Sequence, residues 1–189
     1  GPKKNRMLGN RADYVIYVID RSGSMHGSFE DVQKELRESI EGLVANWPDG
    51  QGGVVTQQFH VILFADGAAI EIGGRRLADA TEDHKVRAID ELADIQPLGQ
   101  TDPLPALRRA FEDLKRVPAG KTCSIELLTD GSFPDNPAAL ALVTKLNDDI
   151  QAQVNTVLYG NYSPEAEAVL RQIATRNGGR YKYVSPDEL

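Results

Sequence analysis

Nearly continuous apolar runs recur along the chain, and amphipathic stretches separate them. The runs cover residues 14–19, 60–64, 124–128 and 154–159, with a shorter run at 180–184. Strands that helices cover on both faces have this unbroken apolar character, because neither face meets water. The alternation of such runs with helical stretches is typical of β–α–β units, so the pattern predicts a parallel sheet.

A further apolar run, residues 68–72, follows the turn-forming pair Asp66-Gly67. This turn predicts a strand that returns beside its predecessor, and we expect the strand to pair antiparallel at the edge of the sheet. The predicted fold class is therefore α/β. It is a Rossmann-like three-layer α/β/α sandwich with a mostly parallel six-stranded sheet and one antiparallel edge strand.

Apolar residues at a spacing of about 3.6 positions predict five helices between the strands. The stripes are Phe29, Val32, Leu36, Ile40 and Leu43 in the first helix, Val86, Ile89 and Leu92 in the second, Leu104, Leu107, Phe111 and Leu114 in the third, Leu142, Leu146 and Ile150 in the fourth, and Val169, Leu170 and Ile173 in the fifth. Ser28, Asn136 and Ser163 are the predicted N-caps. A sixth helix is expected to begin at Ser185-Pro186 and to be cut short.

Length and composition favour a single domain. The chain has 189 residues, of which 41% are hydrophobic and 26% charged, as in ordinary globular domains. Residues 1–12 are expected to form an N-terminal arm that begins with a tag remnant, Gly1-Pro2. Residues 13–189 are expected to form one domain whose last helix is truncated.

The charge balance narrows the class of partner. A net charge of −7 disfavours nucleic acid and anionic membrane surfaces, and no cluster of Lys and Arg with interleaved aromatics offsets it. No apolar run approaches the ~18 residues of a membrane span, so direct membrane insertion of this segment is not expected. The single cysteine, Cys123, is expected to be a buried, inert thiol. A single cysteine does not identify the compartment. The cell surface, the periplasm and attachment of the protein to a membrane through other regions all stay open.

Five oxygen-bearing side chains stand near the ends of two predicted strands and in one loop. They are Asp20, Ser22 and Ser24 in Asp-Arg-Ser-Gly-Ser, Thr101 in Gly-Gln-Thr-Asp-Pro, and Asp130 in Leu-Leu-Thr-Asp-Gly. Carboxylates and hydroxyls without His or Cys suit a hard divalent cation and disfavour zinc or copper. The predicted cofactor is therefore Mg²⁺, with Mn²⁺ and Ca²⁺ as alternatives.

The expected topology explains how these five residues meet. Open parallel sheets bind ligands beyond the carboxyl ends of their strands, where the strand order reverses. If the strands at 14–19 and 124–128 are neighbours there, Asp20 and Asp130 lie at matching ends. Gly23 lets the serine loop curl around a point, and the loop with Thr101 can close over the same point. Three neutral hydroxyls leave the cation able to attract an anion, so capture of a partner's Asp or Glu carboxylate is predicted.

Asp20-x-Ser22-x-Ser24, Thr101 and Asp130 resemble the metal-ion-dependent adhesion site (MIDAS) of a von Willebrand factor type A (VWA) domain. The resemblance covers nearly the whole chain, and the sequence is most similar in character to bacterial members of the family. It implies a metal held by the two serines and the threonine, with the aspartates bound directly or through water. It also implies a non-enzymatic module for adhesion or assembly, in which an acidic residue of the protein partner completes the octahedron.

Two other interpretations stay open. One is a metal-assisted phosphohydrolase or phosphate-binding protein, because Ser22 and Ser24 precede a predicted helix N-terminus that can hold an anion. No Gly-x-Gly-x-x-Gly or Gly-x-Ser-x-Gly motif supports it. The other is a structural subunit in which the metal only joins the loops. A metal that captures a partner's carboxylate leaves one coordination position open, whereas a metal that only joins the loops is saturated by protein ligands.

Other polar and aromatic residues have structural interpretations. Asp102 is expected to cap a helix, and His26 is expected to face solvent. His60 and His84 are expected to be structural. Trp47 is expected to pack against the end of the first helix.

Overall fold

The computed structural model describes residues 11–131, 133–185 and 187. The main sheet has the strand order β5-β4-β1-β7-β8-β9, and β6 also pairs with β4. The strands are β1 (Tyr14–Asp20), β4 (Gln58–Phe64), β5 (Ile70–Ile72), β6 (Ala78–Asp79), β7 (Cys123–Thr129), β8 (Gln153–Tyr159) and β9 (Tyr181–Val184). β4, β1, β7, β8 and β9 run parallel to one another, as the apolar runs predict.

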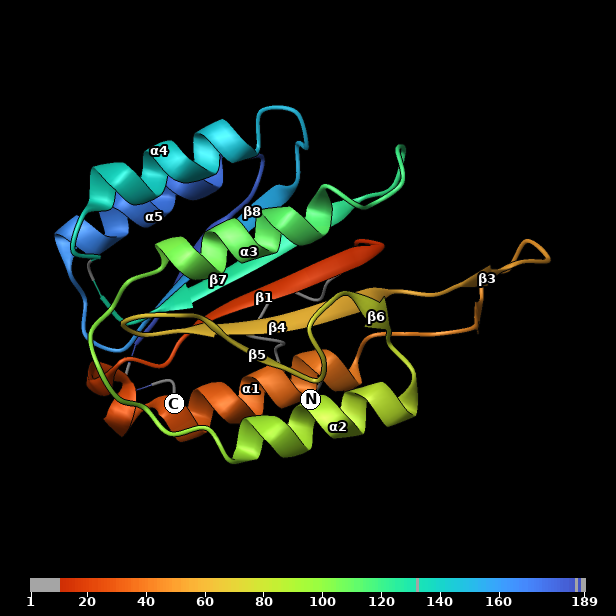
Figure 1. Ribbon diagram of the computed structural model, residues 1–189, viewed down its shortest axis with the longest axis horizontal. Coiled ribbons are helices and arrows are strands. Elements are labelled where there is room, and N and C mark those ends of the chain that lie inside the picture. Colours follow the sequence, from red (N-terminus) through yellow and green to blue (C-terminus); the bar gives the residue numbers. More distant parts are fainter. Residues whose placement is uncertain (1–10, 132, 186, 188–189) are drawn as a thin grey trace.

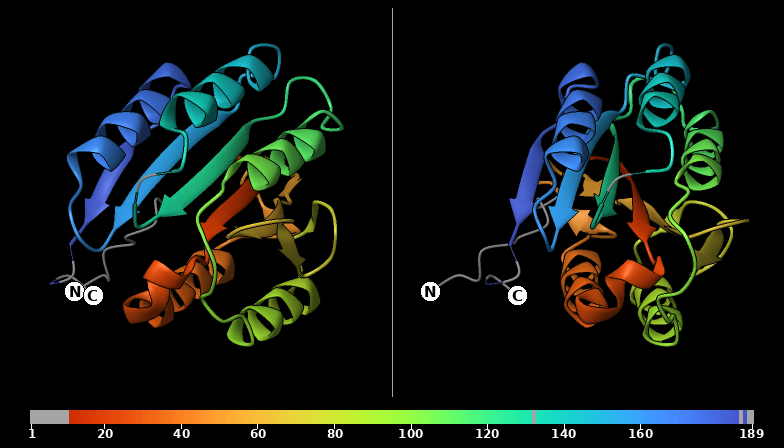
Figure 2. Two further views of the ribbon diagram at one scale, coloured as in Figure 1. Left: turned by 60° about the vertical axis from the view of Figure 1, so that its left-hand side comes forward. Right: turned by 90° about the vertical axis from the view of Figure 1, so that its left-hand side faces the viewer.

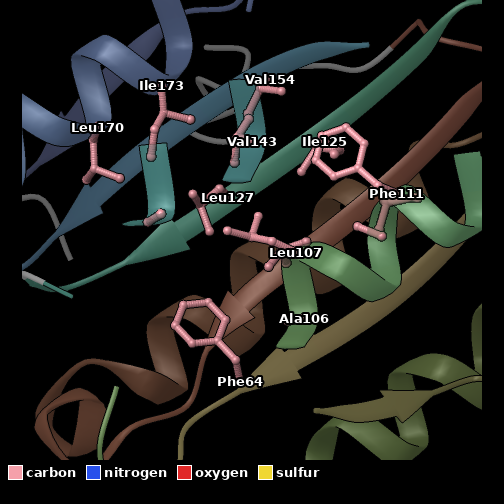
Figure 3. Packing of buried hydrophobic residues seen from close by; sticks show 14 of the residues in the cluster. Phe64, Ala106, Leu107, Phe111, Ile125, Leu127, Val143, Val154, Leu170 and Ile173 are labelled. Atoms are coloured by element: carbon pink, nitrogen blue, oxygen red, sulfur yellow. The ribbon is translucent and has the colours of Figure 1, made fainter. Parts of the chain in front are cut away.

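Helices cover both faces of this sheet and give the molecule three layers (Figures 1 and 2). The helices are α1 (Phe29–Glu41) and α2 (Glu82–Ala93) on one face, and α3 (Leu104–Leu114), α4 (Asn136–Leu146) and α5 (Pro164–Arg176) on the other. Alternate residues of β1 enter the two cores: Tyr17 packs with α1, and Ile16 packs with the α3–α5 side, part of which is drawn in Figure 3. The predicted three-layer α/β/α fold is confirmed.

The antiparallel edge strand is also confirmed, since β5 pairs antiparallel with β4. The structure adds β6, a two-residue strand that pairs antiparallel with the beginning of β4. So short a strand leaves no apolar run in the sequence, and the prediction therefore did not include it.

The prediction for Trp47 is wrong. β2 (Trp47–Pro48) pairs antiparallel with β3 (Val54–Val55) in a small hairpin separate from the main sheet. The Trp47 side chain is 62% exposed and does not pack against the end of α1 as a core residue would. A large apolar side chain is usually covered by other residues, and the prediction assumed this for Trp47. In this hairpin the Trp47 side chain faces solvent instead.

The apolar stripe predicted for α2 is wrong at one position, because Val86 is exposed and its neighbour Lys85 is buried. The Lys85 ammonium donates hydrogen bonds to the carbonyls of Glu41, at 3.1 Å, and Leu43, at 2.5 Å. The last carbonyls of a helix have no partner within the helix. Burial of Lys85 therefore satisfies the C-terminal end of α1.

The predicted N-cap is correct for α5 and one residue off for α4. Ser163 caps α5 as predicted, and its hydroxyl accepts the backbone N–H of Ala166. The cap of α4 is Asp135, one residue before the predicted Asn136. Asn136 instead accepts the backbone N–H of Phe133, so its amide stabilises the approach to the helix.

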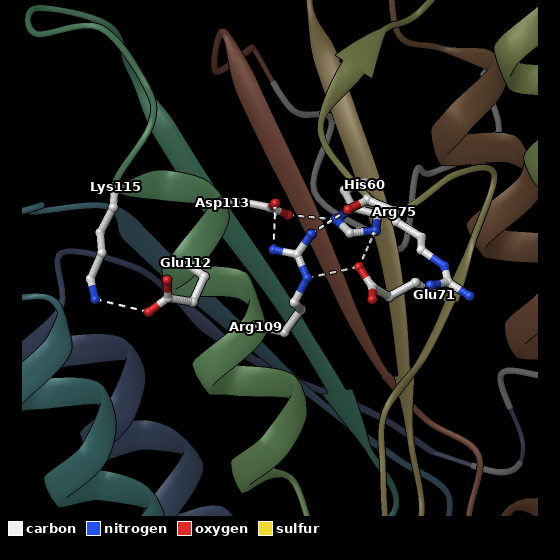
Figure 4. A network of polar contacts seen from close by, with 7 residues as sticks. All are labelled: His60, Glu71, Arg75, Arg109, Glu112, Asp113 and Lys115. Atoms are coloured by element: carbon white, nitrogen blue, oxygen red, sulfur yellow. Dashed lines mark hydrogen bonds and ion pairs between the residues drawn. The ribbon is translucent and has the colours of Figure 1, made fainter.

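The structural role predicted for His60 is confirmed by a buried polar network (Figure 4). His60 Nδ1 lies 2.5 Å from Asp113 of α3, and its Nε2 lies 3.1 Å from Glu71 of β5. Arg109 contacts both carboxylates, at 2.8 Å for Glu71 and 2.7 Å for Asp113. The network joins α3 to the antiparallel edge of the sheet.

Other predictions concern single residues and the chain ends. His84 stacks on Phe59 and is structural, as predicted. Cys123 is half-buried, and burial raises the pKa of its thiol, which favours the unreactive form. Within the described residues, no helix is long and apolar enough to cross a membrane. The predicted arm and sixth helix fall mostly on residues 1–10, 186, 188 and 189, which lie outside the described residues, whereas Ala12 packs against the core.

Candidate metal centre

Asp20 and Asp130 lie at the ends of two neighbouring parallel strands. Asp20 is the last residue of β1, and Asp130 comes directly after β7, whose Leu128 lies opposite Ile19. β4 lies on the other side of β1, so the strand order reverses between β1 and β7. The two carboxylates therefore lie at the topological switch point, as the sequence predicts.

The loop after β1 brings both serines to these carboxylates. Asp20 Oδ1 accepts the backbone N–H of Ser22 at 2.7 Å, and this bond turns the chain at the end of β1. The next residues form a 3-10 helix, η1 (Gly23–Gly27). The hydroxyl oxygens of Ser22 and Ser24 lie 3.0 Å apart, and Ser24 donates to Asp130 Oδ1 at 3.0 Å. The side-chain oxygens of Ser22, Ser24 and Asp130 thus form one connected group, and Asp20 joins it through the backbone N–H of Ser22.

Thr101 comes to the same region through its backbone neighbours. Gly23 donates its N–H to the carbonyl of Gly99 at 2.9 Å, two residues before Thr101. On the other side, Asp102 donates its N–H to the carbonyl of Ala65, just beyond β4. Thr101 itself is half-buried and has no hydrogen bond to the other four residues within the part of the chain that the structure describes. The structure therefore joins its loop, and not its hydroxyl, directly to the group.

Asp102 and His26 are charged or titratable neighbours of the site. The N-cap of α3 is Pro103, one residue after the predicted cap Asp102. The Asp102 carboxylate instead accepts the backbone N–H of Leu104 at 3.1 Å, so it stabilises the turn into α3 without being the cap residue. His26 lies in η1 and is exposed to solvent. Neither residue is hydrogen-bonded to Asp20 or Asp130 among the described contacts.

Thr129 is a residue of the site that the sequence argument missed. Its hydroxyl donates to Asp20 Oδ2 at 2.7 Å, and both side chains are fully buried. With the Ser22 N–H on Oδ1, each oxygen of the Asp20 carboxylate has a donor that fixes its orientation. The signal was the threonine directly before Asp130, at the strand position that follows the Leu128–Ile19 pair.

The electrostatics of the site favour a positive charge. Burial, together with the neighbouring charge of Asp20, raises the pKa of Asp130 to about 6. Among the described residues, neither carboxylate has an ion pair with Lys, Arg or His. Two adjacent carboxylates without a basic partner are stabilised by a cation between them.

The hydroxyls are essential to any cation site at this position. In the described part of the chain, no group of three or more His, Cys, Asp or Glu side chains is arranged to hold a metal. Asp20 and Ser22 are buried, Asp130 and Thr101 are half-buried, and Ser24 is exposed. The oxygens thus extend from the interior at the end of β1 to the solvent.

Curated relatives match most of this chain with only a small part of their own. The human von Willebrand factor A domain-containing protein 3B is 27% identical over 90% of this chain and 12% of its own length. The human inter-alpha-trypsin inhibitor heavy chain H4 is 27% identical over 92% of this chain and 18% of its own length. This chain therefore corresponds to a small fraction of these relatives.

Solved structures share the fold at low sequence identity. A von Willebrand factor type A protein from Catenulispora acidiphila has a TM-score of 0.76 at 20% identity, covering 92% of this chain and 38% of its own. A pilus adhesin from Lactobacillus rhamnosus GG has a TM-score of 0.72 at 15% identity, covering 97% and 29%. These two neighbours agree with a bacterial-type fold.

A metal is named for one further structural neighbour. Proximal thread matrix protein 1 from the mussel byssus, described with a zinc-occupied MIDAS motif, has a TM-score of 0.68 at 19% identity and covers 96% of this chain and 44% of its own. The sequence model of the von Willebrand factor type A domain matches residues 15–133, well over half of the chain. On this match and on the three-layer fold, the chain belongs to the von Willebrand factor type A domain family.

Proposed function

We propose that this VWA domain is a protein-interaction module that captures an Asp or Glu carboxylate of its partner through a divalent cation. The family consists in general of interaction modules rather than enzymes. The cation would be held by Asp20, Ser22, Ser24, Thr101 and Asp130, and it would supply a Lewis-acidic centre for the incoming carboxylate. The observation that carries the proposal is the connected group of oxygens between β1 and β7.

The spacing of these oxygens fits a small divalent cation. Adjacent ligands of an octahedral ion with metal–oxygen distances of about 2.1 Å lie about 3.0 Å apart. Ser22 Oγ and Ser24 Oγ, and Ser24 Oγ and Asp130 Oδ1, have this separation of 3.0 Å. The donor set contains only oxygens, which supports Mg²⁺ or Mn²⁺. Zinc belongs in the comparison because the mussel protein has it in its motif.

The graded exposure of the site supports capture rather than a metal that only joins loops. The buried residues Asp20 and Ser22 lie at the protein side of the oxygen group, and the exposed Ser24 lies at the solvent side. A cation bound between them would keep a face open to solvent, where water or a carboxylate can bind. The chain's hydrogen bonds orient the ligands, and the partner would complete the coordination.

Phosphate-ester hydrolysis has less support. A hydroxyl nucleophile needs a base within hydrogen-bond reach. The Asp130 carboxylate lies within reach of the Ser24 hydroxyl, but in the proposed site it is a ligand of the cation. Among the described residues, no histidine is hydrogen-bonded to Ser22, Ser24 or Thr101. His60 is bound to Asp113 and Glu71 in the interior, and His84 stacks on Phe59.

Calorimetric titration with Mg²⁺, Mn²⁺ and Zn²⁺ tests this proposal. Wild type should bind one of these ions saturably, and Asp130→Asn should lose the binding. Asp148→Asn is the matched control, because it removes the same charge from an exposed position outside the site. Acetate should then bind only to the metal-loaded wild type.

Each alternative has its own outcome in the same experiment. Metal binding that acetate does not affect would indicate a cation that only joins the loops. Metal-dependent turnover of para-nitrophenyl phosphate would favour the phosphohydrolase. Absence of metal binding by the folded wild type would contradict the proposal altogether.

A further inference from the structure

The β2–β3 hairpin lies at the end of the molecule opposite the candidate metal centre (Figure 1). Its apolar side chains are exposed. Trp47 is 62% exposed, Val54 63% and Val55 37%. Every residue from 46 to 55 is exposed, and neither strand contributes to the two hydrophobic cores. We call Trp47, Pro48, Val54 and Val55 the hairpin surface. Exposed apolar patches of this kind are typical of interaction sites.

Local hydrogen bonds give this surface a defined shape. The Asp49 carboxylate accepts the backbone N–H groups of Gln51 and Gly53, at 2.7 and 3.0 Å. Asp49 also donates its own N–H to the Gly53 carbonyl, and the backbone N–H of Asn46 donates to Thr56 Oγ1 at 2.9 Å. The backbone that carries the apolar side chains is therefore ordered before any partner arrives, which reduces the entropy cost of binding.

A pocket adjoins the hairpin surface. Its volume is about 540 Å³, and it lies between the C-terminal end of α1, the beginning of α2 and the base of the hairpin. Its lining includes Trp47, Glu41, Glu82 and Lys85. Trp47 thus belongs to both the hairpin surface and the pocket.

The pocket presents negative charge to solvent. The cation among its lining residues is Lys85, whose side chain is 7% exposed and whose ammonium donates to the carbonyls of Glu41 and Leu43. Lys85 also forms a 3.6 Å ion pair with Glu82, whose side chain is 88% exposed, so two carboxylates accompany one cation in this lining. The carboxylates of Glu41 and Glu82 are exposed, and Asp49 adds a third in the turn of the hairpin. An indole ring beside carboxylates is a favourable place for an ammonium or guanidinium group.

We propose that the hairpin surface and its pocket dock a protein segment that carries a Lys or Arg next to apolar side chains. The cationic group would lie on the Trp47 ring beside Glu41 and Glu82, and the apolar side chains would cover Val54 and Val55. This interaction is independent of the metal centre, which lies at the other end of the molecule.

Charge complementarity disfavours two other occupants. A second copy of this chain would bring the same carboxylates against this face, and the chain has a net charge of −7. An anionic lipid surface would be repelled for the same reason. A basic and apolar protein segment satisfies both the charge and the apolar area.

Selection from a display library of random short peptides on the intact domain tests the proposal. Trp47 is the only tryptophan of the chain, so its emission reports directly on this surface. We expect the selected peptides to carry Lys or Arg beside apolar residues and to shift the emission to shorter wavelength. Trp47→Ala should lower the affinity for a labelled peptide by at least about tenfold. The double variant Glu41→Gln/Glu82→Gln should also lower this affinity, and the loss should be largest at low salt.

Matched variants separate this surface from other sites. Tyr162→Ser removes another aromatic side chain, 52% exposed, and should leave peptide binding unchanged. Asp130→Asn should also leave it unchanged, which keeps the result independent of the metal proposal. Far-ultraviolet circular dichroism verifies the fold of each variant. Selected peptides that bind equally to Trp47→Ala, or that are acidic, would overturn the inference. So would Trp47-dependent self-association in sedimentation, or Trp47-dependent binding to phosphatidylserine vesicles.

Discussion

Thr129 orients Asp20 without belonging to the proposed ligand set. Its hydroxyl donates to Asp20 Oδ2 at 2.7 Å, in a fully buried position. Thr129→Val keeps the shape of the side chain and removes the donor. We expect metal affinity to fall about 10- to 100-fold, as for other residues that orient metal ligands. Calorimetric titration with Mn²⁺ measures this change.

Thr156→Val is the matched control for that prediction. Thr156 is equally buried on the neighbouring strand β8, and its hydroxyl donates to the Leu170 carbonyl, away from the metal centre. This variant should lose stability but keep Mn²⁺ affinity. Equal metal affinity of Thr129→Val and wild type would show that Asp20 needs no such donor.

Gly99 allows the loop that carries Thr101 to approach the serine loop. Its φ is +83°, and an added Cβ would overlap the Asp66 carboxylate. Gly99→Ala therefore combines backbone strain with a collision, and both would displace Thr101. We predict a loss of Mn²⁺ affinity beyond the loss of stability, measured by calorimetry and by urea unfolding.

Gly120→Ala provides the control for Gly99→Ala. Gly120 has the same φ of +83°, but no atom lies within 4 Å of its added Cβ. The variant should lose about 1 kcal/mol of stability from the left-handed backbone alone and keep its metal affinity. If both alanine variants bind Mn²⁺ like wild type, the position of the Thr101 loop is not important for the metal.

Glu91 links α2 to the end of β5 in a pH-dependent way. The backbone N–H of Gly73, which donates to Glu91 at 2.7 Å, lowers the pKa of Glu91 below its ordinary value of 4.5, and Arg87 adds to the shift. The folded-state pKa is thus the lower one. The bond stabilises the fold above the unfolded pKa, and this contribution is lost as the pH falls through the folded pKa.

Glu91→Gln tests that link by urea unfolding. The midpoint should lie below that of wild type at pH 7, and the difference should shrink as the pH falls through the folded-state pKa of Glu91. Asp90→Asn, an exposed change on the same helix, should leave the midpoint nearly unchanged throughout this pH range. A Glu91→Gln difference of constant size would contradict an electrostatic origin.

Arg109 connects α3 to β5 through the network around His60. Its guanidinium contacts Glu71 and Asp113, and Asp113 is 5% exposed (Figure 4). Arg109→Met leaves these carboxylates without their guanidinium partner, so we predict a loss of about 2 kcal/mol in urea unfolding. Lys115→Met, at the C-cap of the same helix, breaks an exposed pair with Glu112 and should lower the stability much less than Arg109→Met. Similar effects of the two variants would mean that burial of the network adds nothing.

The elements that the sequence predicts well are those with two buried faces. β1 and β7 form solid apolar runs because both cores use them, and the positions of Asp20 and Asp130 follow from these strand ends. Two-residue strands such as β6 leave no such pattern. Burial of Lys85 was also beyond the sequence, because its partners are backbone carbonyls of α1, which no side-chain pattern reveals.

At the scale of the whole molecule, the two proposed interaction sites lie at opposite ends of one sheet. The metal centre follows the carboxyl ends of β1 and β7, as the switch-point rule predicts. The hairpin surface lies at the other end and was not predicted, because an exposed Trp47 has the same sequence pattern as a buried one. The domain could therefore join two partners, one acidic and one basic.

In the proposed site, a bound cation keeps a coordination position open for a partner's carboxylate. Longitudinal relaxation of water protons, measured with Mn²⁺ bound to the domain, reports whether that position is open. We predict that exchangeable water on the bound ion markedly increases the relaxation rate and that acetate reduces this increase. The Asp130→Asn variant should show no such increase. Bound Mn²⁺ without this increase, or an increase that acetate leaves unchanged, would contradict capture of a carboxylate at this site.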